Sequence, residues 1–233
     1  MSVFSPRAGD RIVRNLRKIS RVGLLEVQPV FLHIPKTAGT SLRRMMDQAF
    51  WGHPILNVPG GGPRRERIDR MPQSHFDRYS VYRGHFLPEF SRRVRNPFLF
   101  TFLRRPEDHL LSYYYHYLSL GLMTQTLEAF LEDSSSDNIM TRSLAGKPSA
   151  EDAIDALAAM DFVGLTEEFE EDATRLFEAL GRKSVPAARW KVTEGRPAAD
   201  DLPERVLQAV ERRTGEDRKV YDWAVRQRRT RRA

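Results

Sequence analysis

One short segment constrains the fold of this chain more than any other: an apolar strand that runs into a glycine-containing turn and then a helix. The stretch from Val27 to Leu32 predicts a buried β-strand near 28–33, and a helix is predicted from about Thr40 to Phe50. Between them stands His33-Ile34-Pro35-Lys36-Thr37-Ala38-Gly39-Thr40-Ser41. Backbone N–H groups at a helix N-terminus lack intrahelical acceptors and carry partial positive charge, and Lys36 adds a full charge. The segment therefore predicts a site for a phosphate or sulfate ester.

The order of residues in this turn differs from that of a Walker loop. A Walker loop reads G-x-x-x-x-G-K-[ST], whereas here Lys36 precedes Gly39 and no glycine stands five residues before the lysine. The segment alone leaves one alternative open. It could be an ordinary strand-to-helix turn, with Gly39 giving backbone freedom and Thr40 or Ser41 acting as N-cap.

Length and composition favour a single globular domain. The 233 residues are 40% hydrophobic and 30% charged, which is ordinary for a protein with a full apolar core. Apolar stretches fall short of the roughly 20 residues that span a bilayer, and the N-terminus has no apolar signal core, so we expect a cytoplasmic protein without a transmembrane segment. The chain has no cysteine, which excludes disulfides and cysteine-ligated metals.

The net charge of +7 favours anionic ligands. One arginine cluster follows Gly60-Gly61-Gly62, and two interpretations of it stay open: solvated surface, or a wall that guides an anionic acceptor. The C-terminal arginines are interpreted as a solvated, frayed tail. Nucleic-acid binding is not expected, because neither interleaved aromatic residues nor a known fold signature accompany the arginines. The cluster comprises Arg64, Arg65, Arg67 and Arg70, and the tail comprises Arg226, Arg228, Arg229, Arg231 and Arg232.

Strands alternate with helices along the chain, which predicts an α/β fold. We expect a basic leader over 1–25, a single three-layer domain over 26–228 with helices flanking a mostly parallel sheet, and a basic tail over 229–233. A Pro/Gly-rich loop is predicted from Gly52 to Pro63. The predicted strands are 28–33, 80–84, 97–103 and 162–165, and the predicted helices are 40–50, 106–120, 124–132, 137–145, 149–160, 166–181, 202–213 and 216–228.

A second group of anion-binding residues follows the third predicted strand. Arg104 comes directly after the strand, Pro106 starts the next helix, and Ser112 lies two turns along it. A guanidinium offers a rigid fork of donors for phosphate oxygens, and a serine hydroxyl can add one more. A plain strand end with a proline-started helix is the alternative. Two such groups in this order on successive sheet elements favour phosphate binding.

The two groups together resemble the sulfotransferases that use 3′-phosphoadenosine 5′-phosphosulfate (PAPS). The likeness is to the carbohydrate branch, which includes heparan sulfate 2-O-sulfotransferase and bacterial members. The order P-K-T-x-G-T-S resembles the family's 5′-phosphosulfate loop, and Arg104 with Ser112 resembles its 3′-phosphate site. Weaker likeness at Asp137 to Arg142 and at Phe162 to Glu167 extends the resemblance over most of 28–181. The resemblance implies a P-loop-NTPase-like sulfotransferase fold, PAPS as donor and 3′-phosphoadenosine 5′-phosphate (PAP) as product. The implied cofactor-binding residues are Pro35, Lys36, Thr37, Ala38, Gly39, Thr40, Ser41, Arg104 and Ser112.

One histidine is a candidate general base. His85 comes just past a predicted strand, at the carboxyl edge where open α/β sheets build their sites, and imidazole can take a proton near neutral pH. It resembles the family's catalytic histidine, which stands directly before a phenylalanine. The resemblance implies that Lys36 steadies charge on the departing phosphate oxygen while His85 takes the acceptor proton. Two positions depart from the family pattern: Arg83 replaces a second histidine, and Arg105 replaces Asp or Asn.

The remaining histidines have weaker claims. His33 adjoins the phosphate loop and could line the site, although an orienting hydrogen bond to the backbone is the simpler interpretation. His53, His75 and His109 are interpreted as loop or surface residues. The candidates for contact with the acceptor are His116, Arg142 and Arg64. Because no His/Asp/Glu cluster has metal-ligand spacing, we expect no metal.

The sequence favours transfer of a sulfuryl group from PAPS to an acceptor hydroxyl, on a carbohydrate or glycolipid. Two alternatives stay open: a P-loop-like nucleotide kinase or phosphotransferase, against which the misplaced lysine argues, and a non-catalytic module that binds anionic glycans or lipid head groups. Acceptor specificity is expected in the loops 52–78, 116–148 and 184–200. Candidates to close over the cofactor or acceptor are Arg189, Lys191, Thr193 and Arg196.

Overall fold

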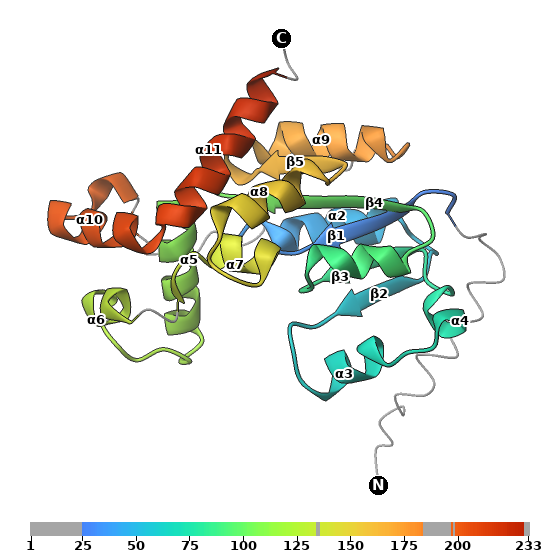
Figure 1. Cartoon of the computed structure of the whole chain (residues 1–233), viewed down its shortest axis with the longest axis horizontal. Helices are drawn as coiled ribbons and strands as arrows, with labels where there is room; N and C mark the ends of the chain where they lie inside the picture. The colour runs from blue at the N-terminus through green and yellow to red at the C-terminus, as the bar shows by residue number, and fades with distance from the viewer. Residues whose placement is uncertain (1–24, 134–135, 184–196, 198, 231–233) are drawn as a thin grey trace, which may run out of the picture.

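The computed structural model describes residues 25–133, 136–183, 197 and 199–230, which form an α/β structure around a five-stranded sheet (Figure 1). The strand order is β2-β3-β1-β4-β5, and every neighbouring pair is parallel. The predicted fold class is thereby confirmed. The strands are β1 (Gln28–Leu32), β2 (Ile55–Val58), β3 (Val81–Gly84), β4 (Pro97–Leu103) and β5 (Phe162–Leu165).

Helices connect the strands, and each of the eight predicted helices corresponds to an observed one. Short helical segments precede and follow β3, and another follows β5. The helices are α2 (Gly39–Ala49), α3 (Pro63–Asp69), α4 (Gln73–Phe76), η1 (Pro88–Arg93), α5 (Pro106–Ser119), α6 (Leu127–Glu132), α7 (Ile139–Ala145), α8 (Ala150–Ala158), η3 (Thr166–Glu168), α9 (Phe169–Ala179), η4 (Ala199–Asp201), α10 (Glu204–Arg213) and α11 (Gly215–Thr230).

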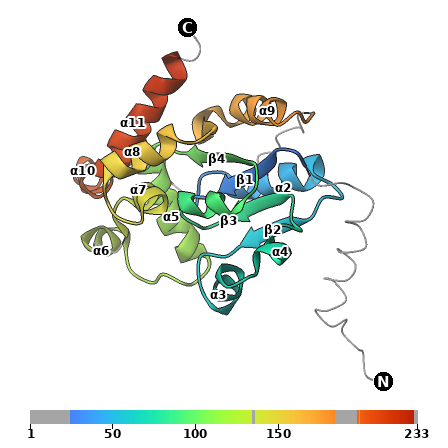
Figure 2. The same cartoon turned by 45° about the vertical axis from the view of Figure 1, so that its right-hand side comes forward.

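The sheet is covered on both faces, which makes three layers. Successive side chains of a strand point to opposite faces, so the apolar run of β1 needs cover on each side. Phe31 packs with residues of α2 and α9, whereas Val30 and Leu32 pack with residues of α7, α8 and α11. In Figure 1, α7 and α8 lie in front of the sheet and α2 lies behind it. A further core cluster joins α5, α6 and α10 beside the sheet (Figure 2).

The predicted loop from Gly52 to Pro63 is wrong in its centre, because it contains β2. Ile55 pairs with Val81 and Val58 with Gly84, which places this four-residue strand at the edge of the sheet. Prolines and glycines on both sides hide so short a strand from sequence patterns, since its formation depends on a distant neighbour. Three residues of the arginine cluster that follows, Arg64, Arg65 and Arg67, lie in α3, with Pro63 in its first turn, and Arg70 is the C-cap residue.

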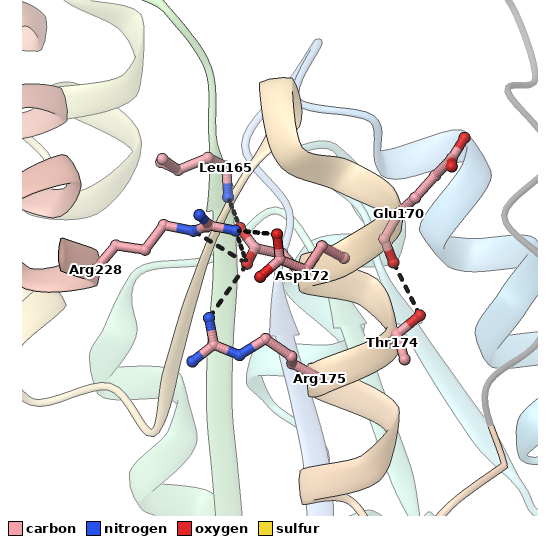
Figure 3. A network of polar contacts seen from close by, with 7 residues as sticks. Leu165, Glu170, Asp172, Thr174, Arg175 and Arg228 are labelled. Atoms are coloured by element: carbon pink, nitrogen blue, oxygen red, sulfur yellow. Dashed lines mark hydrogen bonds and ion pairs between the residues drawn. The ribbon is translucent and has the colours of Figure 1, made fainter. Parts of the chain in front are cut away.

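The C-terminal arginines are only partly a solvated tail. Helix α11 continues to Thr230, and the side chain of Arg228 is 10% exposed. Its guanidinium pairs with Asp172 at 2.7 Å (Figure 3). It also pairs with Glu171 at 3.4 Å, so the predicted frayed tail is wrong for this residue. The leader 1–24, most of the segment 184–198 with its four cofactor-closing candidates, and the tail residues 231–233 lie outside the described residues.

In the described part of the chain, no helix combines the length and the apolar character that crossing a bilayer requires. The expected cytoplasmic location stays a prediction.

Candidate active site

Three segments that carry predicted site residues meet at one edge of the sheet. The strands β3, β1 and β4 are neighbours, and their carboxyl ends are followed by His85, by the loop 33–41 and by Arg104. In open parallel sheets the ligand site lies at this edge, where the chain turns from one half of the sheet to the other. Residues far apart in the sequence therefore converge because the strands are parallel.

The backbone of the loop after β1 is bent in an unusual way. Lys36 and Ala38 adopt left-handed conformations, with φ of 68° and 60°. For residues with a side chain this costs about 1–2 kcal/mol each, and such strain collects at ligand sites. Left-handed residues at alternate positions turn successive N–H groups toward one concave side, which is the geometry of an anion-binding nest.

The N-terminus of α2 is not arranged as an ordinary capped turn. The N-cap residue is Ala38, whose methyl group cannot accept a hydrogen bond, and Thr40 and Ser41 lie inside the first turn rather than at the cap. The proposed capping of an ordinary turn by these two residues is therefore wrong. The first turn contains no carboxylate, because its residues are Gly39-Thr40-Ser41-Leu42. The positive end of the helix is thus suited to an anion.

The hydroxyl groups of the loop differ in their surroundings. Thr37 is fully buried, and its Oγ1 donates to the carbonyl oxygen of Ile34 at 2.9 Å. The hydroxyl proton therefore makes a hydrogen bond inside the loop. Thr37 can donate to an anion through its backbone N–H instead. Ser41 is buried in the first turn of α2, and Thr40 is exposed beside it.

The second predicted group lies against this loop. Nη1 of Arg104 donates to the carbonyl oxygen of Lys36 at 3.2 Å, and Ser112 is buried on α5, which begins two residues after Arg104. The structure therefore brings the arginine and the lysine-bearing loop together. Arg105 donates its backbone N–H to Glu167 at 2.8 Å and its Nε–H to Asp108 at 2.8 Å.

His85 lies beside the same loop. Its ring is hydrogen-bonded to the backbone of His33, and the two imidazole centroids are 4.6 Å apart. Burial lowers the pKa of His85, the bond to His33 partly opposes this, and the charge of Arg43 lowers it further. The imidazole is therefore neutral near pH 7, which is the form that can take a proton.

His33 has a larger place in the site than the sequence suggests. Its ring lies across the start of α2, and a Cβ atom added at Gly39 would come within 1.7 Å of its Nε2. Gly39 is thus required by close approach. Burial, with the neighbouring His85, Arg43 and Lys36, lowers the pKa of His33 to about 3.

The interpretation of His109 as a loop or surface residue is wrong. It lies in α5, is fully buried, and its Nε2 is 2.7 Å from the carbonyl oxygen of Pro35. No pattern in the sequence indicates this contact, because it joins positions 74 residues apart. His75 is exposed, as expected. His53 is half-buried, with its Nε2 3.4 Å from Nη2 of Arg182.

The acceptor-site candidates are spread over three elements. His116 lies one turn beyond Ser112 with its ring edge-on to Tyr117, and exposed Arg142 donates its Nε to the carbonyl oxygen of Asp137. Arg64 is exposed on α3.

Another arginine of the cluster makes the contact with the site. Nη1 of Arg65 donates to the carbonyl oxygen of His85 at 2.7 Å, and its Nε pairs with Asp69 at 2.8 Å. Arg83 is buried, and its guanidinium donates to the side chain of Asn57 and to the carbonyl oxygen of Arg43 and pairs with Asp47. We therefore assign Arg83 a structural part in joining β3 to β2 and α2.

Among the described residues, no group of three or more His, Cys, Asp or Glu side chains could hold a metal ion. Mg²⁺ in nucleotide sites often has only one or two protein ligands, completed by phosphate oxygens and water. The expectation of no metal stays a prediction.

Comparison with known proteins gave structural matches only. No family model and no curated protein matches the chain. The chain is similar to a sulfotransferase from Alicyclobacillus acidocaldarius, with 16% identity and a TM-score of 0.48 over 85% of this chain and 95% of that one. It is also similar to mouse sulfotransferase SULT7A1 in complex with PAP, with 14% identity and a TM-score of 0.43 over 86% and 69% of the two chains. The chemistry of the site rests on the side chains described above.

Proposed function

We propose that this chain transfers a sulfuryl group from PAPS to a hydroxyl group of a carbohydrate or glycolipid. One observation carries the proposal: a left-handed, uncapped phosphate loop is joined through the carbonyl oxygen of Lys36 to Arg104, with His85 beside it. Two anion-binding groups in contact suit a ligand with phosphates at two positions of one nucleotide.

The residues present fit the two ends of such a donor. The loop N–H groups and Lys36 suit the 5′ end, and the guanidinium of Arg104 with the hydroxyl of Ser112 suits the 3′-phosphate. PAPS would supply a sulfuryl group attached to its 5′-phosphate, so that transfer to an acceptor hydroxyl leaves PAP. Lys36 and the loop N–H groups would stabilise the negative charge that grows on the departing phosphate oxygen.

His85 is the proposed general base. Its lowered pKa keeps the imidazole neutral, and its place at the end of β3 sets it at the carboxyl edge shared with the loop. It would accept the proton of the acceptor hydroxyl, while Arg65 holds its backbone carbonyl in place. Preorganised donors and positioning would supply most of the rate enhancement.

Nucleotide binding by calorimetry tests the proposal. PAP is expected to bind more tightly than adenosine 5′-phosphate, because Arg104 and Ser112 recognise the additional phosphate. The Ser112→Ala variant is expected to weaken this preference while keeping its affinity for adenosine 5′-phosphate, because among the described residues Ser112 makes no bond to the loop that binds the 5′ end. Preferential binding of ATP with magnesium would instead support a kinase. Labelled sulfate from PAPS, offered with oligosaccharides, glycolipids and small alcohols, then identifies the acceptor class.

Turnover by a lysine variant provides the catalytic test. Lys36→Ala is expected to lose about a hundredfold in rate, since removal of one preorganised donor typically costs about 3 kcal/mol of transition-state stabilisation. Its thermal unfolding should match that of the wild type. Arg212→Ala removes an equal charge from an exposed position on α10 and should keep full activity. Equal rates for the two variants would contradict the role of Lys36.

A further inference from the structure

Three consecutive carbonyl oxygens of the phosphate loop are each held by a side-chain donor. The hydroxyl of Thr37 donates to Ile34 at 2.9 Å, Nε2 of His109 donates to Pro35 at 2.7 Å, and Nη1 of Arg104 donates to Lys36 at 3.2 Å. Two of these donors come from outside the loop, from the start of α5 and from the end of β4.

These bonds orient the peptide groups of the loop. In a trans peptide the C=O group and the following N–H group point in opposite directions. With the carbonyls of Pro35 and Lys36 directed at His109 and Arg104, the N–H groups of Lys36 and Thr37 face the other way. Carbonyl oxygens repel an anion and N–H groups attract it. The two contacts therefore direct the carbonyl oxygens of Pro35 and Lys36 away from a bound anion and leave the N–H groups of Lys36 and Thr37 facing it.

The chemical state of His109 follows from its surroundings. A carbonyl oxygen can only accept, so Nε2 must carry the proton. Nδ1 is buried, and no hydrogen-bond partner for it lies among the described residues. Burial lowers the pKa of His109 to about 4, the bond to Pro35 partly opposes this, and the charges of Arg104 and Lys36 lower it further. The side chain is therefore a neutral Nε2–H imidazole.

A buried imidazole with one unpaired nitrogen is a costly residue for this position. Its neighbours on α5, Leu110, Leu111 and Tyr114, belong to an apolar core cluster, and an apolar side chain would pack there without leaving a buried nitrogen unpaired. Compared with an apolar residue, the histidine contributes the hydrogen bond to the carbonyl oxygen of Pro35. Ser112 lies three residues further along the same helix, on the same face.

We propose that His109 is a positioning residue that fixes the phosphate loop through the carbonyl of Pro35 and couples it to the helix that bears Ser112. This inference rests on the proposed function. Through His109, the loop for the 5′ end of the nucleotide and the helix for its 3′ end form one rigid unit. Without the bond the Pro35–Lys36 peptide can rotate, and an anion then meets a loop whose N–H groups are not aligned.

Substitutions at position 109 separate the hydrogen bond from the packing. His109→Leu removes the donor with little change in volume, and we expect PAP affinity and turnover to fall about tenfold. His109→Gln places an amide N–H at the same number of bonds from the backbone and should restore most of the loss. Tyr114→Phe is the matched control, because it removes a bond of 2.9 Å from the same helix to Gln125, away from the loop.

A measurement on the unliganded wild-type chain tests the same contact without any substitution. Nitrogen chemical shifts of the imidazole should show the neutral Nε2–H tautomer at about pH 7. A charged ring or a proton on Nδ1 would overturn the inference. This test does not depend on whether His109→Leu folds.

The binding results separate the two proposals. Wild-type binding of PAP together with unchanged binding by His109→Leu would overturn this inference alone. Loss of affinity in both His109→Leu and Tyr114→Phe would also overturn it, because the effect would then come from α5 in general. A wild-type chain that binds no PAP would overturn the proposed function and this inference with it.

Discussion

The protonation of His85 should be visible in the pH dependence of turnover. A general base acts in its neutral form, so activity is present above its pKa and is lost as the pH falls below it. Burial lowers the pKa of His85 from the ordinary 6.5. We therefore expect the acidic limb of kcat/KM to have its midpoint below 6.5, measured between about pH 5 and pH 8.

The matched histidine for this experiment is His75. It is exposed at the surface in α4, and His75→Ala should keep the wild-type profile. His85→Asn should lose most of its turnover at every pH. A midpoint above 6.5, or an unchanged profile in His85→Asn, would count against His85 as the base.

Gly39 offers a test of the packing around the loop. An alanine inside a helix is normally more stable than glycine by about 1 kcal/mol. Here the added Cβ would lie 1.7 Å from Nε2 of His33, so we expect Gly39→Ala to lower the melting temperature and to displace the imidazole pair. Thermal unfolding and turnover measure both effects.

The controls for this substitution are another glycine and a second-site variant. A Cβ at Gly61 would meet nothing within 4 Å, so Gly61→Ala should be harmless. Replacing His33 by alanine in the Gly39→Ala background removes the obstructing ring and should recover stability, though not turnover. If both glycine variants melt at the wild-type temperature, the close approach of His33 to the helix is not a constraint.

Helix α11 is joined by ion pairs to α5, which bears Ser112, and to α9. Arg218 in its first half pairs with buried Glu107 at the start of α5, and Arg228 near its end pairs with Asp172 in α9. Asp172 also accepts the N–H of Leu165, the last residue of β5, at 2.8 Å (Figure 3). One carboxylate thus ties together a strand end and two helices.

Removal of this carboxylate should be strongly destabilising. Asp172→Ala leaves the guanidinium of Arg228 and the N–H of Leu165 without their main partner, and losing one member of a buried ion pair costs about 3 kcal/mol or more. Arg175→Ala is the control, since this arginine is 38% exposed and 3.7 Å from the same carboxylate. Denaturant unfolding measures both. Similar stabilities for the two variants would show that the pair in Figure 3 contributes little.

The sequence predicts elements well where their own pattern determines them. The apolar runs at 97–103 and 162–165 and the proline-started helix at 106 give boundaries within two residues of those observed. The strand β2 is different, because its four residues carry no pattern of their own among prolines and glycines and are ordered by pairing with β3.

The candidate site divides in the same way. His85 and Arg104 could be found because each directly follows a recognisable strand, and Lys36 because it lies in the turn between a recognisable strand and the helix after it. His109 and Arg65 could not, since their contacts with Pro35 and His85 are made across the fold and depend on which face of a helix turns inward. Helical periodicity predicts on which face of a helix a histidine lies, but it does not predict which group that histidine contacts.

The balance of protons between the folded and unfolded chain should make the whole molecule acid-sensitive. Burial lowers the pKa of His33 to about 3 and of His109 to about 4, so the unfolded chain, with histidines near 6.5, binds about two more protons on these groups near pH 5. Burial has the opposite effect on Asp217, whose pKa is raised to about 6, so the folded chain holds about one more proton there. The unfolded chain therefore binds about one more proton in total than the folded chain. The free energy of unfolding should fall as the pH is lowered from about 6.5 to about 4.

The slope of stability against pH measures this balance. One net proton corresponds to about 1.4 kcal/mol per pH unit, and burial also lowers the pKa of His53 and His85, which adds to the same trend. Asp217→Asn cannot take up a proton, so the opposing contribution disappears and the slope should steepen; His109→Gln should make it shallower. Unfolding free energies from denaturant titrations at several pH values give the slopes. A wild-type stability that rises on acidification through this range would mean that the buried histidines do not stay neutral in the folded chain.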